Sequence, residues 1–229
     1  MTAAPRGRCR ALSRPAGLAA FAAGADLCID TFKHAAAPMD RFRALCPFTV
    51  WPEPVIPVPG RPGQAAVSVE GVWQGLKLVD GHPDLDQFGG RPHKRPPDAS
   101  RGPGYDYAAS EFLLGDRVVG LLEARFAIYL PVFTYVLENL VPAAVEEEIA
   151  AVLDRGGNVA FYDWDANFDI EDCSRSFSHS ALAAAWFNGE YDRYRTPALP
   201  WSGARSRGGL TTGSEDAAAP REVKVRALR

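Results

Sequence analysis

The most constraining feature of the sequence is an almost uninterrupted apolar segment at residues 121–140. Aliphatic and aromatic side chains occupy every face of a helix drawn through it, and a helix that is hydrophobic on all sides has to be buried. Three residues in the segment, Glu123, Arg125 and Pro131, argue against a membrane span. The sequence therefore predicts a central helix around which the rest of a domain packs.

Arg125 lies inside this apolar segment, where an unpaired charge is costly. Two interpretations are open. The guanidinium either pairs with an acidic side chain, or it lines a cavity and binds an anionic group of a ligand. The second interpretation makes Arg125 a candidate substrate-binding residue.

Composition limits the class of protein. The chain has 229 residues, 47% of them hydrophobic, which is enough for one sizeable core. Both ends are basic and the middle is acidic, and an acidic middle argues against general nucleic-acid binding. The cysteines form no C-x-x-C pair and have no neighbouring histidine pair, so neither a zinc site nor a redox motif is predicted, and no cofactor is expected. Scattered thiols of this kind indicate a reduced, cytoplasmic protein.

The predicted organisation is a single globular domain over residues 25–195 between two disordered ends. Residues 1–24 carry arginines before a weak, alanine-rich stretch that Pro15 and Gly17 interrupt, so we expect a disordered leader. Residues 196–229 are rich in proline, glycine, serine, arginine and alanine, which is typical of a disordered tail.

Between these ends the expected elements are mainly helices, with a few short strands. The expected strands are residues 27–32 and 158–162, and the expected helices follow Pro142 and cover residues 181–187. The many prolines of residues 35–63 exclude a helix and predict an extended but ordered arm. Residues 80–107 are expected to form a long, basic loop, which is either a phosphate-gripping flap or simply solvated. The predicted fold class is mainly α (α+β), a single multihelical domain.

A helix is also predicted over residues 68–78, with Ser68 as its N-cap. Its apolar positions, including Trp73, share one face. Glu70, Gln74 and Lys77 follow at helical spacing and form a second, polar stripe beside it. The stripe is either the solvated surface of an ordinary amphipathic helix or a polar site at the edge of the core.

Acidic residues gather in the segment 163–172. They match the first ligand positions of a calcium-binding EF-hand loop, although phenylalanine replaces the required glycine and serine replaces the final glutamate. The segment is therefore a calcium or magnesium site, a plain acidic loop, or a source of carboxylates that share a pocket with Glu70. The residues that match the EF-hand positions are Asp163, Asp165, Asn167 and Asp169.

Several of these features together resemble the NADAR (YbiA-like) superfamily. In that superfamily a proline-containing entry precedes a helix of the form V-E-H-x-Y-Q-A-x-K. Here the proline arm leads into a helix in which Glu70, Gln74 and Lys77 match, Trp73 stands for the aromatic residue, and Gly71 replaces the histidine. The order of the later elements is also similar, but the W-G and N-x-L-G signatures are missing.

The resemblance implies a mostly helical YbiA-like fold and an N-glycosidase that cleaves a C1′–N bond in a nucleotide, ribose-phosphate or ADP-ribose derivative. Such a reaction develops positive charge on the sugar, which a fixed carboxylate stabilises. The candidate catalytic residues are Glu70, Asp163 and Asp169. The candidate substrate-binding residues are Trp73, Gln74, Lys77, Arg125 and Trp164.

Two other functions remain open. The missing signatures favour a non-catalytic module that binds a nucleotide or ADP-ribose. The acidic segment favours a protein that binds calcium or magnesium. For the hydrolase and for the binding module, the expected partner is a small molecule, neither nucleic acid nor a membrane.

Overall fold

The fold is organised around a parallel sheet of three short strands. β1 (Cys9–Ser13) and β2 (Leu27–Asp30) both pair with β7 (Val159–Asp163), which lies between them. The computed structural model describes residues 5–95 and 106–194. All three strands run in the same direction, so their carboxyl ends meet at one edge of the sheet.

The remaining elements, in chain order, are α1 (Arg14–Ala22), η1 (Met39–Leu45), β3 (Ile56–Pro57), β4 (Ala65–Ala66), α2 (Val69–Leu76), η2 (Leu85–Phe88), η3 (Tyr107–Ala109), β5 (Glu111–Leu114), β6 (Arg117–Gly120), α3 (Leu121–Ala124), η4 (Arg125–Tyr129), α4 (Leu130–Asn139), α5 (Ala143–Asp154), α6 (His179–Phe187) and η5 (Tyr191–Tyr194). η4 is a π-helical turn, and the other η elements are 3₁₀ helices. β3 pairs with β4 and β5 with β6, both antiparallel.

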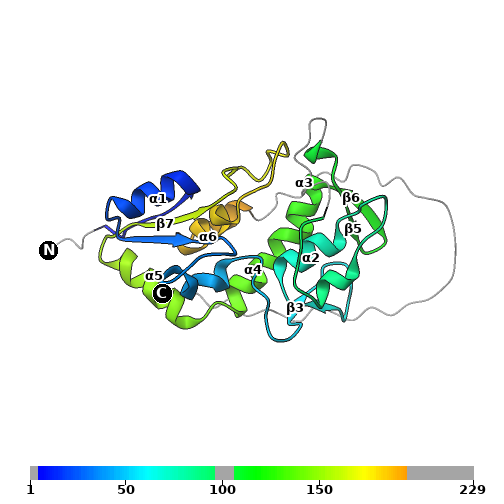
Figure 1. The fold of residues 1–229 in the computed structure, drawn as a ribbon, viewed down its shortest axis with the longest axis horizontal. Helices are drawn as coiled ribbons and strands as arrows, with labels where there is room; N and C mark the ends of the chain where they lie inside the picture. The colour runs from blue at the N-terminus through cyan, green and yellow to red at the C-terminus, as the bar shows by residue number, and fades with distance from the viewer. Residues whose placement is uncertain (1–4, 96–105, 195–229) are drawn as a thin grey trace. The chain divides into compact units, whose positions relative to one another are not determined.

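Alternate residues of β7 serve the two faces of the sheet, as expected for a strand. Val159 and Phe161 belong to the main core, together with the apolar residues of α5 and α6. Ala160 and Tyr162 belong to a smaller cluster under α1. α1 therefore covers one face of the sheet while α5 and α6 cover the other, and Figure 1 shows these helices gathered around β7.

The prediction of a disordered leader over residues 1–24 is wrong for residues 9–22, which form β1 and α1. The ordered domain consequently begins well before residue 25. The sequence did not predict β1 because its partner, β7, is distant in the sequence and no local pattern indicates the pairing. Residues 1–4 and the predicted tail, residues 196–229, lie outside the described residues.

The apolar segment is a single helical run made of α3, η4 and α4, and the prediction of a buried central helix is confirmed for residues 121–139. It contacts α2 on one side and η1 and β3 on another. Figure 1 shows α4 between the elements around β7 and those around α2. Pro131 is the second residue of α4 and lacks an amide hydrogen, which removes one helical bond. The turn widens just before it, where the Leu130 amide donates to the Arg125 carbonyl.

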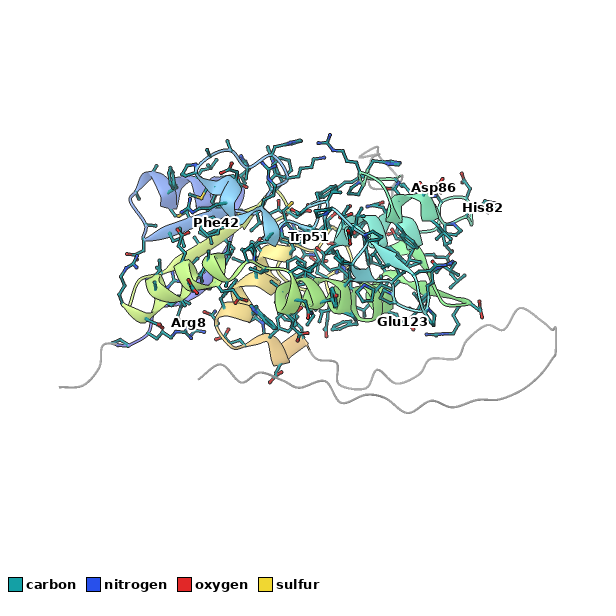
Figure 2. All side chains as sticks on the ribbon, turned by 90° about the horizontal axis from the view of Figure 1, so that it is seen from below. Arg8, Phe42, Trp51, His82, Asp86 and Glu123 are labelled. Atoms are coloured by element: carbon teal, nitrogen blue, oxygen red, sulfur yellow. The ribbon has the colours of Figure 1, made fainter. Side chains whose placement is uncertain are left out.

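The proline-rich arm is ordered as predicted, but it does contain a helix. η1 forms between the prolines at 38 and 47, and its Phe42 and Leu45 side chains are completely buried. A short 3₁₀ helix fits there because it needs few consecutive backbone bonds. Phe42 and Trp51, two aromatic residues of this arm, are labelled in Figure 2. Trp51 is tied to the start of α2 by a backbone bond from its amide to the Val67 carbonyl, 2.8 Å long.

The architecture is mixed α+β. The parallel sheet gives the fold a layered part that the sequence did not predict. Within the described residues, no single helix is long and apolar enough to cross a membrane. The helical run 121–139 and α5 pass that test only as a pair, bent by 89° at the break between them.

Gly17 is required by the close approach of α1 to the sheet. A Cβ atom at this position would lie 2.2 Å from Cγ of Tyr162, well inside van der Waals contact. Glycine in a helix interior normally costs stability relative to alanine. At this position the packing reverses that preference.

We therefore predict that Gly17→Ala lowers the free energy of unfolding by about 1–3 kcal/mol, because the methyl group forces the Tyr162 ring to move. The measurement is urea denaturation of the variant and the wild type. Gly89→Ala is the control, since a Cβ atom there meets nothing within 4 Å and its φ of −98° suits alanine. A stability gain in Gly17→Ala would show that α1 does not pack this closely.

Candidate active site

A cavity of about 360 Å³ opens where the carboxyl ends of β2 and β7 meet α2, η4 and the start of α6. Ligands of parallel sheets commonly bind beyond the carboxyl ends of the strands, because loops from separate strands converge there. The lining residues include Thr31, Phe32 and Lys33 after β2, Asp163, Trp164 and Asp165 at the end of β7, Glu70, Trp73 and Gln74 from α2, and Arg125, Tyr129 and His179.

α2 forms one wall of the cavity. Ser68 begins the helix as predicted, and its Oγ accepts a hydrogen bond of 3.0 Å from the Gly71 amide. All eight residues of α2 are buried, so the alternative of a solvated surface helix is wrong. The helix therefore presents Glu70 and Gln74 to an enclosed space.

Gln74 fixes the position of the Glu70 carboxylate. Its Nε2 donates to Glu70 Oε1 at 2.8 Å, while its own Oε1 accepts from the Arg95 amide at 3.0 Å. Because the two bonds use opposite ends of the amide, they permit only one orientation of the Gln74 side chain. Gln74 was predicted to bind substrate, and in the structure it also holds Glu70 in place.

Arg95 anchors the basic loop to the carboxyl end of α2. Its guanidinium donates to the carbonyls of Gln74 (3.2 Å), Lys77 (2.6 Å) and His82 (3.1 Å). The Gln74 and Lys77 carbonyls lie at the carboxyl end of α2, where carbonyls lack partners within the helix. Figure 2 labels two residues of the segment that follows α2, His82 and Asp86. Arg95 thus has a structural use here, whereas its neighbour Lys94 lines the cavity.

Arg125 forms no ion pair with an acidic side chain of the described residues, and its predicted binding of an anionic ligand group stays a prediction. It is 1% exposed, and it donates to the backbone carbonyls of Ile170 (2.6 Å), Asp172 (2.9 Å) and Arg175 (2.6 Å). The guanidinium lines the cavity but holds the loop after β7. Three of its donors are thus committed to the protein, which weakens the case for Arg125 as a ligand-binding group.

The π-helical turn η4 has Arg125 and Tyr129 at its two ends, and both side chains line the cavity. Such turns occur frequently at functional sites, because the extra residue redirects neighbouring side chains. Here the turn directs the Arg125 guanidinium and the Tyr129 phenol from a core helix towards the cavity. Tyr129 was not predicted as a site residue, and the apolar pattern of its segment concealed it.

Asp163 ends β7, and each of its carboxylate oxygens lies close to a nitrogen of the protein. Its Oδ1 accepts from the Trp164 amide at 2.7 Å, and its Oδ2 lies 3.2 Å from His179 Nδ1. The other ring nitrogen of His179 lies 3.2 Å from the Thr31 carbonyl. His179 is the first residue of α6 and therefore links this helix to the ends of β2 and β7. The sequence did not predict it as a site residue.

The negative charge of Glu70 and Asp163 acts on two neutral groups of the cavity. Burial raises the pKa of Tyr129 well above its ordinary value, and the carboxylates of Glu70 and Asp163 raise it further. Burial also raises the pKa of the Cys46 thiol to about 12, again with contributions from both carboxylates. Tyr129 and Cys46 therefore stay protonated, and Cys46 is not an activated nucleophile.

Trp164 lies at the mouth of the cavity and is 62% exposed. The Arg14 guanidinium carbon lies 5.0 Å from the centre of its ring, and the Phe32 ring meets it edge-on at 5.8 Å. Arg14 is fixed in turn by a 2.8 Å bond to Asp30. The exposed ring is accessible to a flat ligand group, and the stacking role of Trp164 stays a prediction.

Two of the predicted site residues do not line the cavity formed by the described residues, Lys77 and Asp169. Lys77 follows the last residue of α2 and has an extended backbone, with ψ of 132°. Its side chain therefore leaves the polar stripe, and its ammonium lies 5.9 Å from the centre of the Tyr107 ring. Asp169 is exposed and accepts from the Glu171 amide at 2.9 Å.

The acidic segment does not form the EF-hand arrangement. Asn167 Oδ1 accepts from the Asp169 amide at 3.0 Å, and Asp163 is bound to His179 as described above. These oxygens serve the loop's own backbone as local turns. No group of three or more His, Cys, Asp or Glu side chains in residues 5–95 and 106–194 could hold a metal ion.

Comparison with known proteins gives a family but no activity. A family model matches residues 18–183, which is most of the chain. The chain belongs to DUF6939, a family of unknown function. No curated protein and no solved structure matches it. The matched range of DUF6939 begins within α1 and ends within α6, so it contains every residue that lines the cavity.

We predict that Ser68→Ala lowers the free energy of unfolding by about 1–2 kcal/mol, because the buried Gly71 amide loses its acceptor. Ser13→Ala is the matched control. Ser13 is also an N-cap, but its side chain makes no capping bond. Chemical denaturation of both variants measures the difference, and equal losses would contradict the proposed role of Ser68.

The pKa of Cys46 gives a second prediction. Since folding raises it from 9.0 to about 12, the unfolded chain loses this proton first as the pH rises. The free energy of unfolding should therefore fall above pH 9, by up to about 1.4 kcal/mol per pH unit for this group. Cys46→Ala should remove that part of the slope.

Cys9→Ala is a matched variant outside the cavity, because burial also raises the pKa of Cys9 to about 12. Denaturation curves between pH 8 and 10.5 test both, and an unchanged slope in Cys46→Ala would contradict the assignment.

Proposed function

We propose that this DUF6939 protein is an N-glycosidase-like hydrolase that cleaves a C1′–N bond in a nucleotide, ribose-phosphate or ADP-ribose derivative. The observation that carries the proposal is that Glu70 and Asp163, which are far apart in the sequence, line the same cavity. Both are buried, and each is held by hydrogen-bond donors. Oriented carboxylates in an enclosed site are what a developing sugar cation requires.

The geometry suggests a division of roles. As the C1′–N bond breaks, its electron pair leaves with the nitrogen and positive charge develops on the sugar. Asp163, fixed by Trp164 and His179, contributes negative charge close to that cation. Glu70 takes a proton from the attacking water and returns it to the released nitrogen. Tyr129 keeps its own proton and donates a hydrogen bond to the ligand.

The resemblance to the NADAR superfamily supports the same function. Two residues of the matching helix, Glu70 and Gln74, line the cavity, although the third, Lys77, does not. We therefore propose a divergent YbiA-like domain in which α2 is the catalytic wall. The dominance of helices implied by that fold is part of the proposal, as is Asp163 as the second carboxylate in place of Asp169.

A second candidate is a non-catalytic module that binds the same class of ligand. The observation in its favour is that both oxygens of Asp163 already lie close to nitrogens of the protein itself, and that Arg125 donates to backbone carbonyls. Calorimetry combined with product analysis separates the two functions. Binding of AMP or ADP-ribose without release of a base supports the module, and release of a base supports the hydrolase.

We predict that Glu70→Gln lowers kcat by about 10²–10⁴-fold, the usual contribution of a general base. The melting temperature should change little, because a glutamine oxygen still accepts from Gln74. Chromatography of the base released from nucleoside 5′-phosphates and ADP-ribose measures the rate. Glu111→Gln, an exposed carboxylate outside the cavity lining, should retain full activity. Retained turnover in Glu70→Gln would overturn the catalytic assignment.

A further inference from the structure

The cavity has a buried floor and an exposed rim that differ in charge. Glu70, Tyr129 and Asp163 on the floor are at most 9% exposed. Lys33 and Lys94, which also line the cavity, are exposed and so belong to its rim. The two lysines reach the rim from different segments, one after β2 and the other after η2.

The floor is the negative end. Glu70 and Asp163 line the same cavity as Tyr129 and Cys46, and both carboxylates disfavour loss of a proton from those two groups. The Arg125 charge is directed instead at three backbone carbonyls of the loop after β7. A cationic or neutral part of a ligand is therefore favoured at the floor, and an anionic part is disfavoured.

The rim is the positive end. Within the described residues neither Lys33 nor Lys94 forms an ion pair, so neither charge is neutralised locally by an acidic side chain. Lys33 is held by an aromatic contact, since its ammonium lies 4.8 Å from the centre of the Phe48 ring. One carboxylate, Asp165, also lines the cavity next to the exposed Trp164. The two lysines outweigh it.

We propose that Lys33 and Lys94 form a phosphate subsite at the cavity rim, so that a phosphorylated ribosyl ligand binds with its sugar towards Glu70 and Asp163 and its phosphate outwards. The inference rests on the proposed function for the placement of the sugar. It replaces Arg125, predicted from the sequence as the anion-binding group, with two residues whose charges remain available. A phosphate suits two ammonium groups on one cavity rim, because it offers several strongly accepting oxygens.

This arrangement makes the phosphate the main determinant of affinity. An ordinary nucleoside places its sugar at the floor but leaves the rim lysines without an anion. We expect AMP to bind at least about tenfold more tightly than adenosine, as two partly exposed charge contacts provide. Because both lysines are exposed, raising the salt concentration should weaken AMP binding and leave adenosine binding nearly unchanged.

The test is isothermal titration calorimetry on the full chain with AMP, adenosine, ribose 5-phosphate and inorganic phosphate. Titrations in the Glu70→Gln background prevent turnover. Lys33→Ala and Lys94→Ala should each weaken AMP binding about three- to tenfold, and the double variant should bring AMP to the affinity of adenosine. Arg10→Ala, which removes an exposed positive charge on β1 away from the cavity, should leave AMP binding unchanged.

The outcomes separate this inference from the proposed function. Equal affinity for AMP and adenosine, or AMP binding that the double variant leaves unchanged, overturns the phosphate subsite whether or not the protein is an enzyme. Inorganic phosphate that binds as tightly as AMP also overturns it, since the sugar then contributes nothing. A phosphate preference that the lysine variants abolish supports the subsite, even if the wild type releases no base and the hydrolase proposal fails.

Discussion

The site depends on the buried guanidinium of Arg125. Its bonds to three carbonyls join a turn of the central helix to the loop that follows β7, and that loop carries one side of the cavity. A buried cation with carbonyl partners is stable only while all partners remain in place, because a lost bond leaves both a charge and a carbonyl unsatisfied. The contact therefore couples the central helix to the sheet and keeps the cavity open between them.

The π-helical turn makes that contact possible. Pro131 removes one backbone donor from the helix, and the widened turn before it places Arg125 and Tyr129 on the cavity side. The same segment thus supplies the core with leucine, valine and phenylalanine and supplies the cavity with two polar groups. One helix can contribute to both the core and the cavity because its regular geometry is interrupted once.

Within the cavity, hydrogen bonds distinguish the two carboxylates. Glu70 is oriented by Gln74, which is itself held by the Arg95 amide, whereas Asp163 is held by a backbone amide and by His179. Oriented acceptors need little reorganisation when positive charge develops, which is the advantage of a preorganised site. Lys33 and Lys94 are exposed lining residues of the same cavity, and the ligand orientation that we propose rests on this separation of charge.

The sequence by itself determined the elements that local interactions stabilise. The spacing of apolar residues and the cap at Ser68 were sufficient for α2, and the apolar run was sufficient for the central helix. The Glu70–Gln74 pair could be predicted from the helix motif, and Trp164 was chosen as an aromatic residue of the acidic segment; all three line the cavity. The same helical spacing wrongly placed Lys77 beside Glu70 and Gln74. The helix has already ended at Lys77, so its side chain turns away.

Only the tertiary structure decided the rest. The pairing of β1 with β7 joins distant segments and turned a presumed leader into part of the sheet. His179, Tyr129 and Lys33 line the cavity because separate elements converge at the carboxyl ends of the strands, and no spacing along the chain encodes that convergence. Arg125 was recognised as a buried charge from its neighbours in sequence, but its partners are backbone carbonyls, which carry no sequence signal at all.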